Sequence, residues 1–332
     1  MDLNILWFIL IATLFCVYFF LDGMDFGIGM MVPFLGKTDK LNRKMIYAIG
    51  PTWGASEVWL LTAGGAMFAA FPGWYATMFS GFYPALFLLL FALIVRGISI
   101  EFRGKTTSAN SKKAYNIGIG FGNFLAPLLL VVAIACLLRG VPIDESQEYT
   151  GTLFSLFSPF TLFAGITGIA YFIYHGAVVL CLKLSDEIKE TREIGKKAGL
   201  ITIILLLVTT VFSALETDIF KKPVSIVAAI VMLILIILSY LSFLKKVGKI
   251  TVILNALFTV SVIVTVFSAM FPRVMVSDTS DEYSLTIYNI ASGNYTLTVI
   301  SVVTLTLLPI VIGYTLWTHY IFSKKLNEDI EY

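Results

Sequence analysis

Long apolar runs separated by short polar segments make up most of this chain of 332 residues. The runs are about 20 residues long, which as α-helix matches the ~30 Å hydrocarbon core of a bilayer. None of them alternates in the manner of a membrane β-barrel strand, so the backbone must satisfy its hydrogen bonds within helices. The pattern predicts nine transmembrane helices, over 3–34, 52–71, 78–100, 115–138, 160–184, 199–215, 224–244, 250–271 and 297–322.

Composition agrees with a lipid environment. The mean hydropathy is +0.90, and 58% of residues are hydrophobic against 13% charged, where soluble proteins average roughly 25% charged. The longest polar stretches, 139–159 and 272–294, are too short to bury a core of their own. We therefore expect an all-α, polytopic integral membrane protein in which residues 1–332 form a single membrane domain.

Basic residues are distributed unevenly among the loops, and this predicts the orientation, because cytoplasmic loops carry an excess of Lys and Arg. Four of the 23 lie on one side, namely Arg139, Lys221, Lys222 and Arg273. The other nineteen lie on the opposite side: Lys37, Lys40, Arg43, Lys44, Arg96, Arg103, Lys105, Lys112, Lys113, Lys183, Lys189, Arg192, Lys196, Lys197, Lys245, Lys246, Lys249, Lys324 and Lys325. We expect the N-terminus outside and the C-terminus in the cytoplasm. Basic residues that flank a membrane give no sign of a nucleic-acid partner.

Small residues four positions apart predict where helices approach closely. Such pairs are Gly23 with Gly27, Gly65 with Ala69, and Gly118 with Gly122.

Histidine is scarce. His319 falls at the cytoplasmic end of the ninth predicted helix, which leaves His175 as the one internal imidazole. A haem held by two histidines, or a copper centre held by three, cannot be built from one internal imidazole, so we expect this chain to ligate no metal. Two roles fit His175: a hydrogen-bonded packing residue, or a haem-proximal or proton-transfer group.

The ionisable residues within the predicted helices are few and grouped. Asp22 and Asp25 are three apart on one face of the first helix, Glu57 lies in the second, and Arg96 and Glu101 lie toward the end of the third. The predicted topology puts all five in the cytoplasmic half of the membrane. Each costs roughly 2.5 to 3.5 kcal/mol at mid-membrane, so such groups usually face the bundle interior or a hydrated path.

Two interpretations of this group remain open. The aspartates could pair with Arg96 or Arg103 and only fix helix packing. Alternatively the group conducts protons, because paired carboxylates at low dielectric tend to hold a proton at neutral pH and can pass it on. Trp59, two residues from Glu57, would line the same path.

Several segments resemble subunit II of the cytochrome bd quinol oxidases. LDGMDFGIGMMVPFL at 21–35 resembles the N-terminal signature of that family, and EVWLLTAGGAMFAAFP at 57–72 and FSGFY at 79–83 are similar to its next two helices. FPRVM at 271–275 and LTIYN at 285–289 resemble its last outer loop. The resemblance covers the whole chain, most closely over the first hundred residues.

The resemblance implies a heterodimer in the bacterial cell membrane. Subunit I would carry two b-type haems and one d-type haem, oxidise quinol and reduce oxygen to water. This chain would hold no haem ligand, brace subunit I and contribute proton or oxygen paths through Asp22, Asp25, Glu57, Trp59 and Arg96. Quinone, lipid and a small accessory subunit are the further partners implied.

One position departs from the family pattern. The family usually reads WDGN where this chain reads Trp53-Gly54-Ala55-Ser56, so the acidic residue associated there with proton delivery is missing. Protons would then enter mainly through subunit I, unless Glu57 or water bound at Ser56 compensates.

Two other classes of protein fit many of these features. Nine hydrophobic helices with buried carboxylates also describe secondary transporters, although neither an inverted repeat nor a matched pair of broken helices is visible. A purely structural membrane subunit without any path is compatible with every residue.

Overall fold

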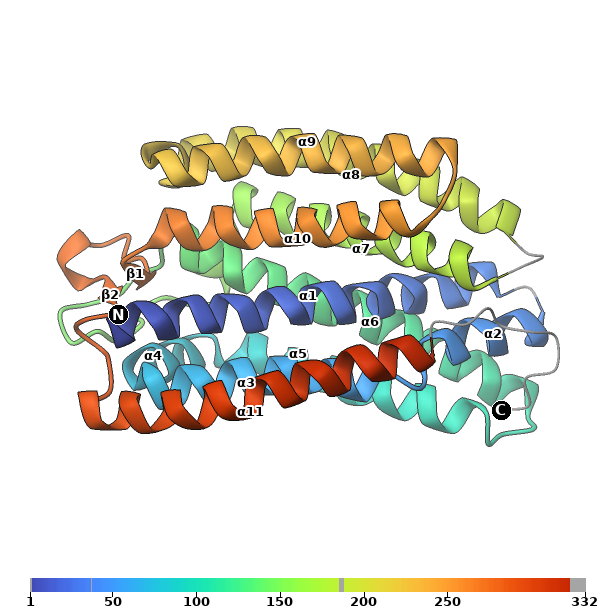
Figure 1. The fold of residues 1–332 in the computed structure, drawn as a ribbon, viewed down its shortest axis with the longest axis horizontal. Coiled ribbons are helices and arrows are strands. Elements are labelled where there is room, and N and C mark those ends of the chain that lie inside the picture. Colours follow the sequence, from blue (N-terminus) through green and yellow to red (C-terminus); the bar gives the residue numbers. More distant parts are fainter. Residues whose placement is uncertain (1, 37, 185–187, 323–332) are drawn as a thin grey trace.

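The computed structural model describes residues 2–36, 38–184 and 188–322 and is an elongated bundle of helices that run along one axis (Figure 1). Eight helices of this described part are long and apolar enough to cross a membrane. These are α1 (Leu3–Leu35), α5 (Tyr83–Arg103), α6 (Ala109–Arg139), α7 (Pro159–Lys183), α8 (Ile188–Glu216), α9 (Pro223–Lys245), α10 (Lys249–Met270) and α11 (Asn294–Ile321). The prediction of a mostly helical, polytopic membrane protein is confirmed.

The second predicted span corresponds to α3 (Trp53–Ala70), which is not among the eight. It has only 18 residues, and Glu57 and several glycines lower its hydropathy. It nevertheless packs along α1, side by side with the longer helices (Figure 1).

Two short helices were not predicted. α2 (Asp39–Ile49) lies beyond the inner end of α1, and α4 (Pro72–Gly81) follows α3 directly. The third predicted span, 78–100, therefore starts too early, because α4 ends before α5 begins at Tyr83 with a proline in its first turn, a position where proline is well tolerated. Conversely, α6 and α8 begin well before the predicted residues 115 and 199. Each of these helices starts within a polar segment that precedes its apolar run.

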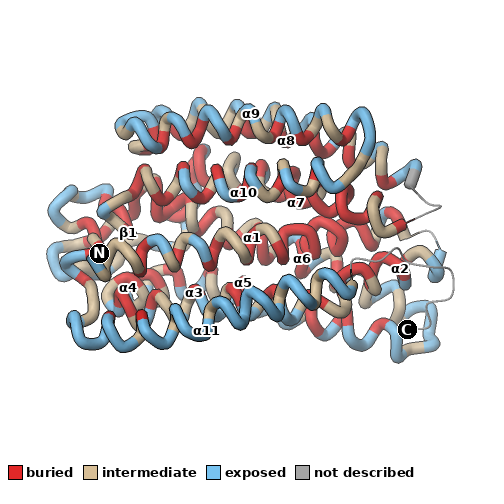
Figure 2. The backbone as a smooth tube through the Cα atoms, in the orientation of Figure 1, coloured by how far each residue is buried: buried red, intermediate tan, exposed pale blue. Residues whose placement is uncertain are grey.

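The helices form two groups. α1, α3, α5 and α6 pack together, α7 to α10 form the second group, and α1 and α6 join the groups by packing on α7. Buried residues concentrate on α1, α6 and α7, whereas α11 runs along the outside (Figure 2). Of the apolar window of α7, 78% is buried, against 11% for α11. α11 therefore has a surface left for lipid or for another subunit.

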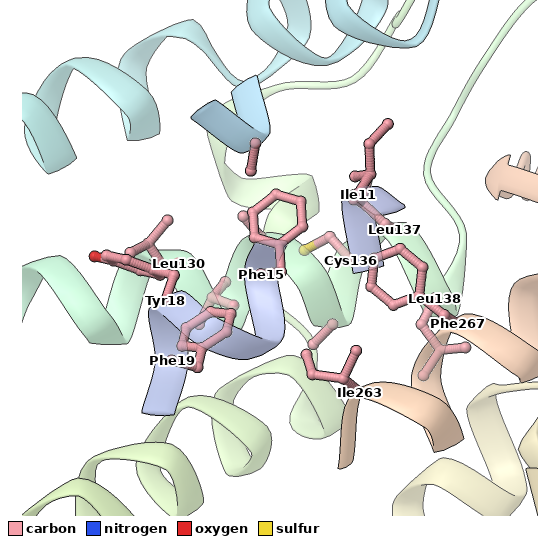
Figure 3. Packing of buried hydrophobic residues seen from close by; sticks show 14 of the residues in the cluster. Ile11, Phe15, Tyr18, Phe19, Leu130, Cys136, Leu137, Leu138, Ile263 and Phe267 are labelled. Atoms are coloured by element: carbon pink, nitrogen blue, oxygen red, sulfur yellow. The ribbon is translucent and has the colours of Figure 1, made fainter. Parts of the chain in front are cut away.

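Apolar side chains pack together around the N-terminal half of α1 (Figure 3). Ile11 and Phe15 of α1 belong to one buried cluster with Cys136 of α6 and Phe267 of α10. The rings of Phe15 and Phe267 lie 6.4 Å apart between centroids. This packing fixes α1 at the centre of the molecule.

The outer loops close one end of the bundle. β1 (Arg273–Met275) pairs antiparallel with β2 (Leu285–Thr286), and three short 3-10 helices complete the loops: η1 (Leu153–Leu156), η2 (Ile219–Lys221) and η3 (Asp281–Tyr283). Val274, Met275 and Leu285 are fully buried. The loops thus add their apolar residues to the core of the bundle.

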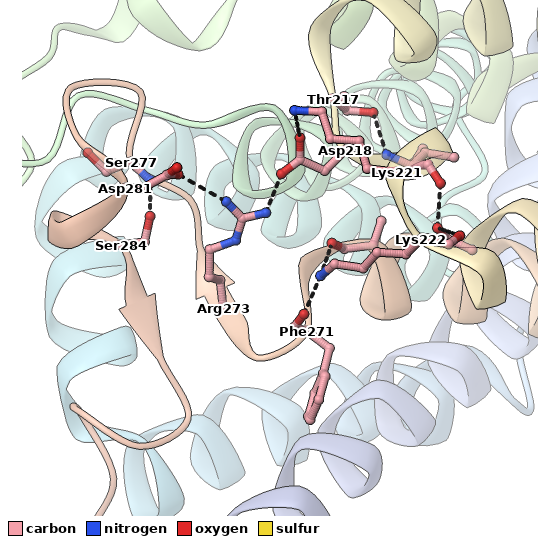
Figure 4. Close-up of polar contacts among 12 residues, drawn as sticks. Thr217, Asp218, Lys221, Lys222, Phe271, Arg273, Ser277, Asp281 and Ser284 are labelled. Atoms are coloured by element: carbon pink, nitrogen blue, oxygen red, sulfur yellow. Dashed lines mark hydrogen bonds and ion pairs between the residues drawn. The ribbon is translucent and has the colours of Figure 1, made fainter.

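A charged network ties these loops together (Figure 4). Asp218, just before η2, pairs with Lys221 at 2.7 Å and with Arg273 of β1, and Arg273 also reaches Asp281 at 3.3 Å. Partial burial alone would raise the pKa of Asp218, but the hydrogen bonds from Lys221 and Arg273 outweigh it and lower that pKa. The loop between α8 and α9 is therefore fastened to the loop between α10 and α11.

The charge count behind the predicted orientation includes Lys37, Lys324 and Lys325, which lie outside the described residues.

Candidate functional site: a buried charged cluster between α1, α3 and α5

The C-terminal half of α1 is enclosed by protein, since every residue from 21 to 32 is buried. Glycines on α1 and α7 allow the two helices to approach this closely. A Cβ added to Gly27 would collide with the carbonyl oxygen of Phe172 on α7, and one added to Gly176 would lie 2.5 Å from the Ile28 nitrogen. With α7 packed on this side and α3 and α5 contacting the two aspartates, Asp22 and Asp25 are 0% exposed.

Arg96 is the cation of the site. Its Nη1 donates to Asp22 Oδ2 at 2.8 Å and its Nη2 donates to Asp22 Oδ1, which makes a two-point ion pair with both side chains fully buried. The same Nη1 lies 3.5 Å from Glu57 Oε1 on α3, and the guanidinium lies 4.6 Å from the centroid of the Phe26 ring. α5 is thereby linked to α1 and α3 at one depth, as the sequence predicted.

Asp25 is held differently. The Ser56 hydroxyl of α3 lies 3.4 Å from Asp25 Oδ2 and 3.1 Å from the Thr52 carbonyl, and it can donate to only one of them at a time. Asp25 Oδ1 has no protein hydrogen-bond partner. Within the described ranges, no basic side chain lies within 4.0 Å of Asp25, and Lys183 of α7 instead donates to the Ala48 carbonyl at 2.7 Å.

Three carboxyl groups, those of Asp22, Asp25 and Glu57, gather around Arg96, and the second cation nearby, Lys183, acts on Asp25 electrostatically without a direct ion pair, so the carboxyl groups outnumber the cations. Burying a net negative charge is costly, and a shared proton removes that cost. The arrangement can hold a proton, and a proton held among several carboxyl groups can be exchanged.

Other predicted residues take separate places. Trp59 is 5% exposed, on the buried face of α3 one turn beyond Ser56, within the apolar core. Glu101 is exposed near the end of α5 and does not join the cluster. Arg103, the alternative partner for the aspartates, pairs with Asp39 at 2.9 Å instead.

His175 has a protein partner at each ring nitrogen. Its Nε2 lies 3.1 Å from the Phe20 carbonyl and its Nδ1 lies 3.0 Å from Asn255 Nδ2, so Nε2 donates and Nδ1 accepts. Tyr171 stacks on the ring. Both ring nitrogens thus have protein partners, as a hydrogen-bonded packing residue requires, and the haem-proximal or proton-transfer role of His175 stays a prediction. Within the described residues, no group of three or more His, Cys, Asp or Glu side chains is placed to hold a metal ion.

Reasoning from the sequence missed Tyr18, whose ring is buried one turn from Asp22 on α1. The signal was its spacing of four residues from Asp22, which puts both side chains on one helix face.

Fold and site together define a polytopic membrane protein with a buried cluster of charged residues in its interior. The sequence profile of the family described as "Cytochrome bd terminal oxidase subunit II" matches residues 3–322. The chain belongs to this family.

Relatives match over nearly the whole length. The chain is 37% identical to "Cytochrome bd ubiquinol oxidase subunit 2" of Bacillus subtilis, covering 98% of this chain and 97% of the relative. It is 32% identical to "Cytochrome bd-I ubiquinol oxidase subunit 2" of Escherichia coli K12, covering 99% and 97%. A chain of the bd oxidase structure from Geobacillus thermodenitrificans shares the fold, with a TM-score of 0.76, 13% identity and coverage of 97% and 99%. None of these relatives supports the transporter interpretation.

Proposed function

We propose that this chain, as subunit II of a quinol:oxygen oxidoreductase complex, braces a haem-bearing subunit I and brings protons from the cytoplasm into the membrane through its buried charged cluster. Subunit I would hold the two b-type haems and one d-type haem and oxidise quinol. Quinone, lipid and a small accessory subunit belong to the proposal as further partners.

The proposed topology has nine spans, with α3 as the ninth, and places the N-terminus outside and the C-terminus in the cytoplasm. Two observations support it. α3 lies alongside α1 within the bundle. The basic residues of α2, including Arg43 and Lys44, lie at the end of the molecule opposite the N-terminus (Figure 1), and positive residues favour the cytoplasmic side.

The face carrying α3 is the proposed contact with subunit I. The Glu57 side chain is 22% exposed there, and a partly exposed carboxylate is costly against lipid but not against a polar group of another subunit. A Cβ added to Gly64 or Gly65 would meet nothing within 4 Å. Small residues with open space beside them are typical of a helix surface that receives a neighbouring helix.

An apolar cleft of about 540 Å³ lies on the same face. It supports the proposal that this subunit also provides a path for oxygen. Leu60 and Phe68 of α3, Leu90 of α5 and Trp74 of α4 are among its lining residues. Molecular oxygen is small and apolar, so such a cleft between α3 and α5 gives it a route from the lipid.

The proposed proton path rests on one observation, the lack of an ion pair at Asp25 among the described residues. A carboxyl group that served only to fix helix packing would have a cation or a full set of hydrogen bonds, because a buried polar atom without a partner destabilises the fold. Asp25 has an orphaned oxygen and no ion pair among the described residues. It sits between the ion pair of Asp22 and the inner end of α1, where a proton from the cytoplasm would arrive.

The test replaces this carboxyl group by an amide. Asp25→Asn keeps the shape and an oxygen that can accept from Ser56, but it cannot take up a proton. We expect slower proton uptake and slower oxygen consumption in the purified two-subunit complex with its haem spectrum intact. Glu193→Gln is the control, since Glu193 is exposed and pairs only with Lys196 at 2.6 Å. Unchanged rates in Asp25→Asn would leave only the structural role.

A further inference from the structure

Among the described residues, three polar atoms around the buried ion pair have no protein partner in full hydrogen-bond geometry: the hydroxyl of Tyr18, which lies within reach of Asp22, Oδ1 of Asp25 and Nε of Arg96. All three residues are 0% exposed. Buried polar groups in native proteins are nearly always hydrogen-bonded, either to protein or to ordered water. Three orphaned atoms at one polar site therefore indicate water bound within the cluster.

Tyr18 faces this cluster from the apolar half of the bundle. Its ring packs edge-on against Phe26, with centroids 6.2 Å apart, and Phe26 in turn lies under the Arg96 guanidinium. Asp22, Arg96 and Glu57 are the charged groups that act on the hydroxyl. In Figure 3 the hydroxyl oxygen lies on the side of Tyr18 that faces away from Phe267.

The position of Tyr18 along α1 is as informative as its contacts. It lies four residues from Asp22, about 6 Å further from the cytoplasmic end, and close to the middle of the Leu3–Leu35 helix. A proton that reaches Asp22 from the cytoplasm would meet this hydroxyl next. Beyond it, Phe15 and Ile11 on the same helix are apolar.

We propose that Tyr18 is a proton-relay residue that extends the path from Asp22 toward the middle of the bilayer through bound water. The protonated carboxyl group of Asp22 gives its proton to a bound water as that water gives one to the Tyr18 hydroxyl, and the hydroxyl releases its own proton to a second water on the outer side, which carries the proton onward. One O–H bond forms as another breaks, so the tyrosine remains neutral throughout. A neutral relay is compatible with complete burial. The inference rests on the proposed proton path through Asp22 and Asp25.

Two other buried tyrosines show that this environment is particular to Tyr18. The Tyr171 hydroxyl is 2.8 Å from Thr259, and the Tyr174 hydroxyl is 2.8 Å from Ser239. Both hydroxyls thus have protein partners within the helix group α7 to α10. Tyr174→Phe is therefore a matched control for the loss of a buried hydroxyl whose partner, Ser239, is not part of the charged cluster.

The experiment compares Tyr18→Phe, Tyr174→Phe and Asp25→Asn in the purified two-subunit complex. Proton uptake during a single turnover is followed with a pH indicator in H₂O and in D₂O. Tyr18→Phe should slow proton uptake about tenfold or more, as expected for losing a positioned proton-transfer group, and should raise the solvent isotope effect. Tyr174→Phe should change neither quantity, and a packing role of Tyr18 would not alter the isotope effect.

The outcomes separate the two proposals. If Asp25→Asn is slow while Tyr18→Phe matches the wild type, the path exists and Tyr18 is not part of it. If both match the wild type, the proton path itself fails. A high-resolution map of the wild-type complex gives an independent check: density for water within hydrogen-bond distance of the Tyr18 hydroxyl supports the relay, and clear absence of such density overturns it.

Discussion

Arg96 and Asp22 form a two-point ion pair with both side chains 0% exposed, although 74 positions separate them along the chain. The pair links α5 to α1 at the depth of the candidate site. Removing one member of a buried pair leaves an uncompensated charge, whereas replacing both by apolar groups is often close to neutral. The pair therefore fixes the helix arrangement as well as the charge of the site.

The first prediction follows from that asymmetry. Arg96→Leu should lower the free energy of unfolding by roughly 3–5 kcal/mol, because Asp22 would stay buried without its cation. The double variant Asp22→Leu/Arg96→Leu should regain much of this loss. Thermal unfolding of the purified complex, measured for both single variants and the double variant, checks it. A double variant no more stable than Arg96→Leu would show that the pair does not determine stability here.

The sequence predicted that the aspartates could pair with Arg96 or Arg103, but not which of the two arginines they meet. Arg96 and Arg103 are seven residues apart, so they share one face of α5 and differ only by about 10 Å in depth. Loop lengths alone cannot decide which of them meets Asp22. In the structure Arg103 forms an ion pair with Asp39 on the unpredicted helix α2, which leaves Arg96 as the partner of Asp22.

Glycine spacing was informative only in part. Gly27 does mark a close helix contact, but a Cβ on Gly65 would meet nothing within the chain. A small-residue pair predicts a neighbour without saying whether that neighbour belongs to the same chain. α2 was missed because it is a short helix whose apolar run, 45–49, is far shorter than a membrane span.

Asp39 gives a prediction about pH. It pairs with Arg43, Arg103 and Lys112 at 3.1, 2.9 and 3.0 Å. Burial alone would raise the pKa of Asp39, but the hydrogen bonds from Lys112 and Arg103 outweigh it and lower the pKa from 3.8 to about 2. Because the folded-state pKa is depressed, the stabilisation is present above the ordinary value and is lost as the pH falls through the folded-state value.

Asp39→Asn should therefore lower the melting temperature of the complex by the same amount throughout pH 5 to 8, and the difference should narrow only below about pH 4. The Asp39 side chain is 42% exposed, so solvent and salt screening keep the effect small. Melting curves at several pH values check this. A difference that changed between pH 5 and 8 would point to another titrating group.

Gly65 provides a prediction about the partner. Gly65→Trp places a large side chain on the open face of α3, where an added Cβ meets nothing within 4 Å among the described residues. If subunit I covers that face, overpacking by roughly 1–3 kcal/mol should weaken the association about tenfold or more. Val227→Trp on α9, where Val227 is 61% exposed, is the control. Co-purification of subunit I measures the effect, and equal yields for the two variants would place the interface elsewhere.

The substitution Gly54→Asp tests whether the acidic residue that the family usually has at this position can be restored. A Cβ at this position meets nothing within 4 Å, so a side chain fits within the chain. Residue 54 lies three positions before Glu57 on α3, so a carboxylate there would extend the cluster toward the cytoplasm on the same helix face. In the first turn of the helix it should also add about 0.3–1 kcal/mol through the helix dipole.

We expect Gly54→Asp to recover part of the proton uptake lost in Asp25→Asn, because a second proton acceptor would stand at the entrance of the cluster. Gly54→Asn in the same background has nearly the same size and no charge, so it separates charge from shape. Proton uptake and oxygen consumption of the two double variants are the measurements. Recovery with aspartate alone would show that protons pass the start of α3 on their way to Glu57, whereas equal rates in both double variants would exclude that route and direct attention to entry through subunit I.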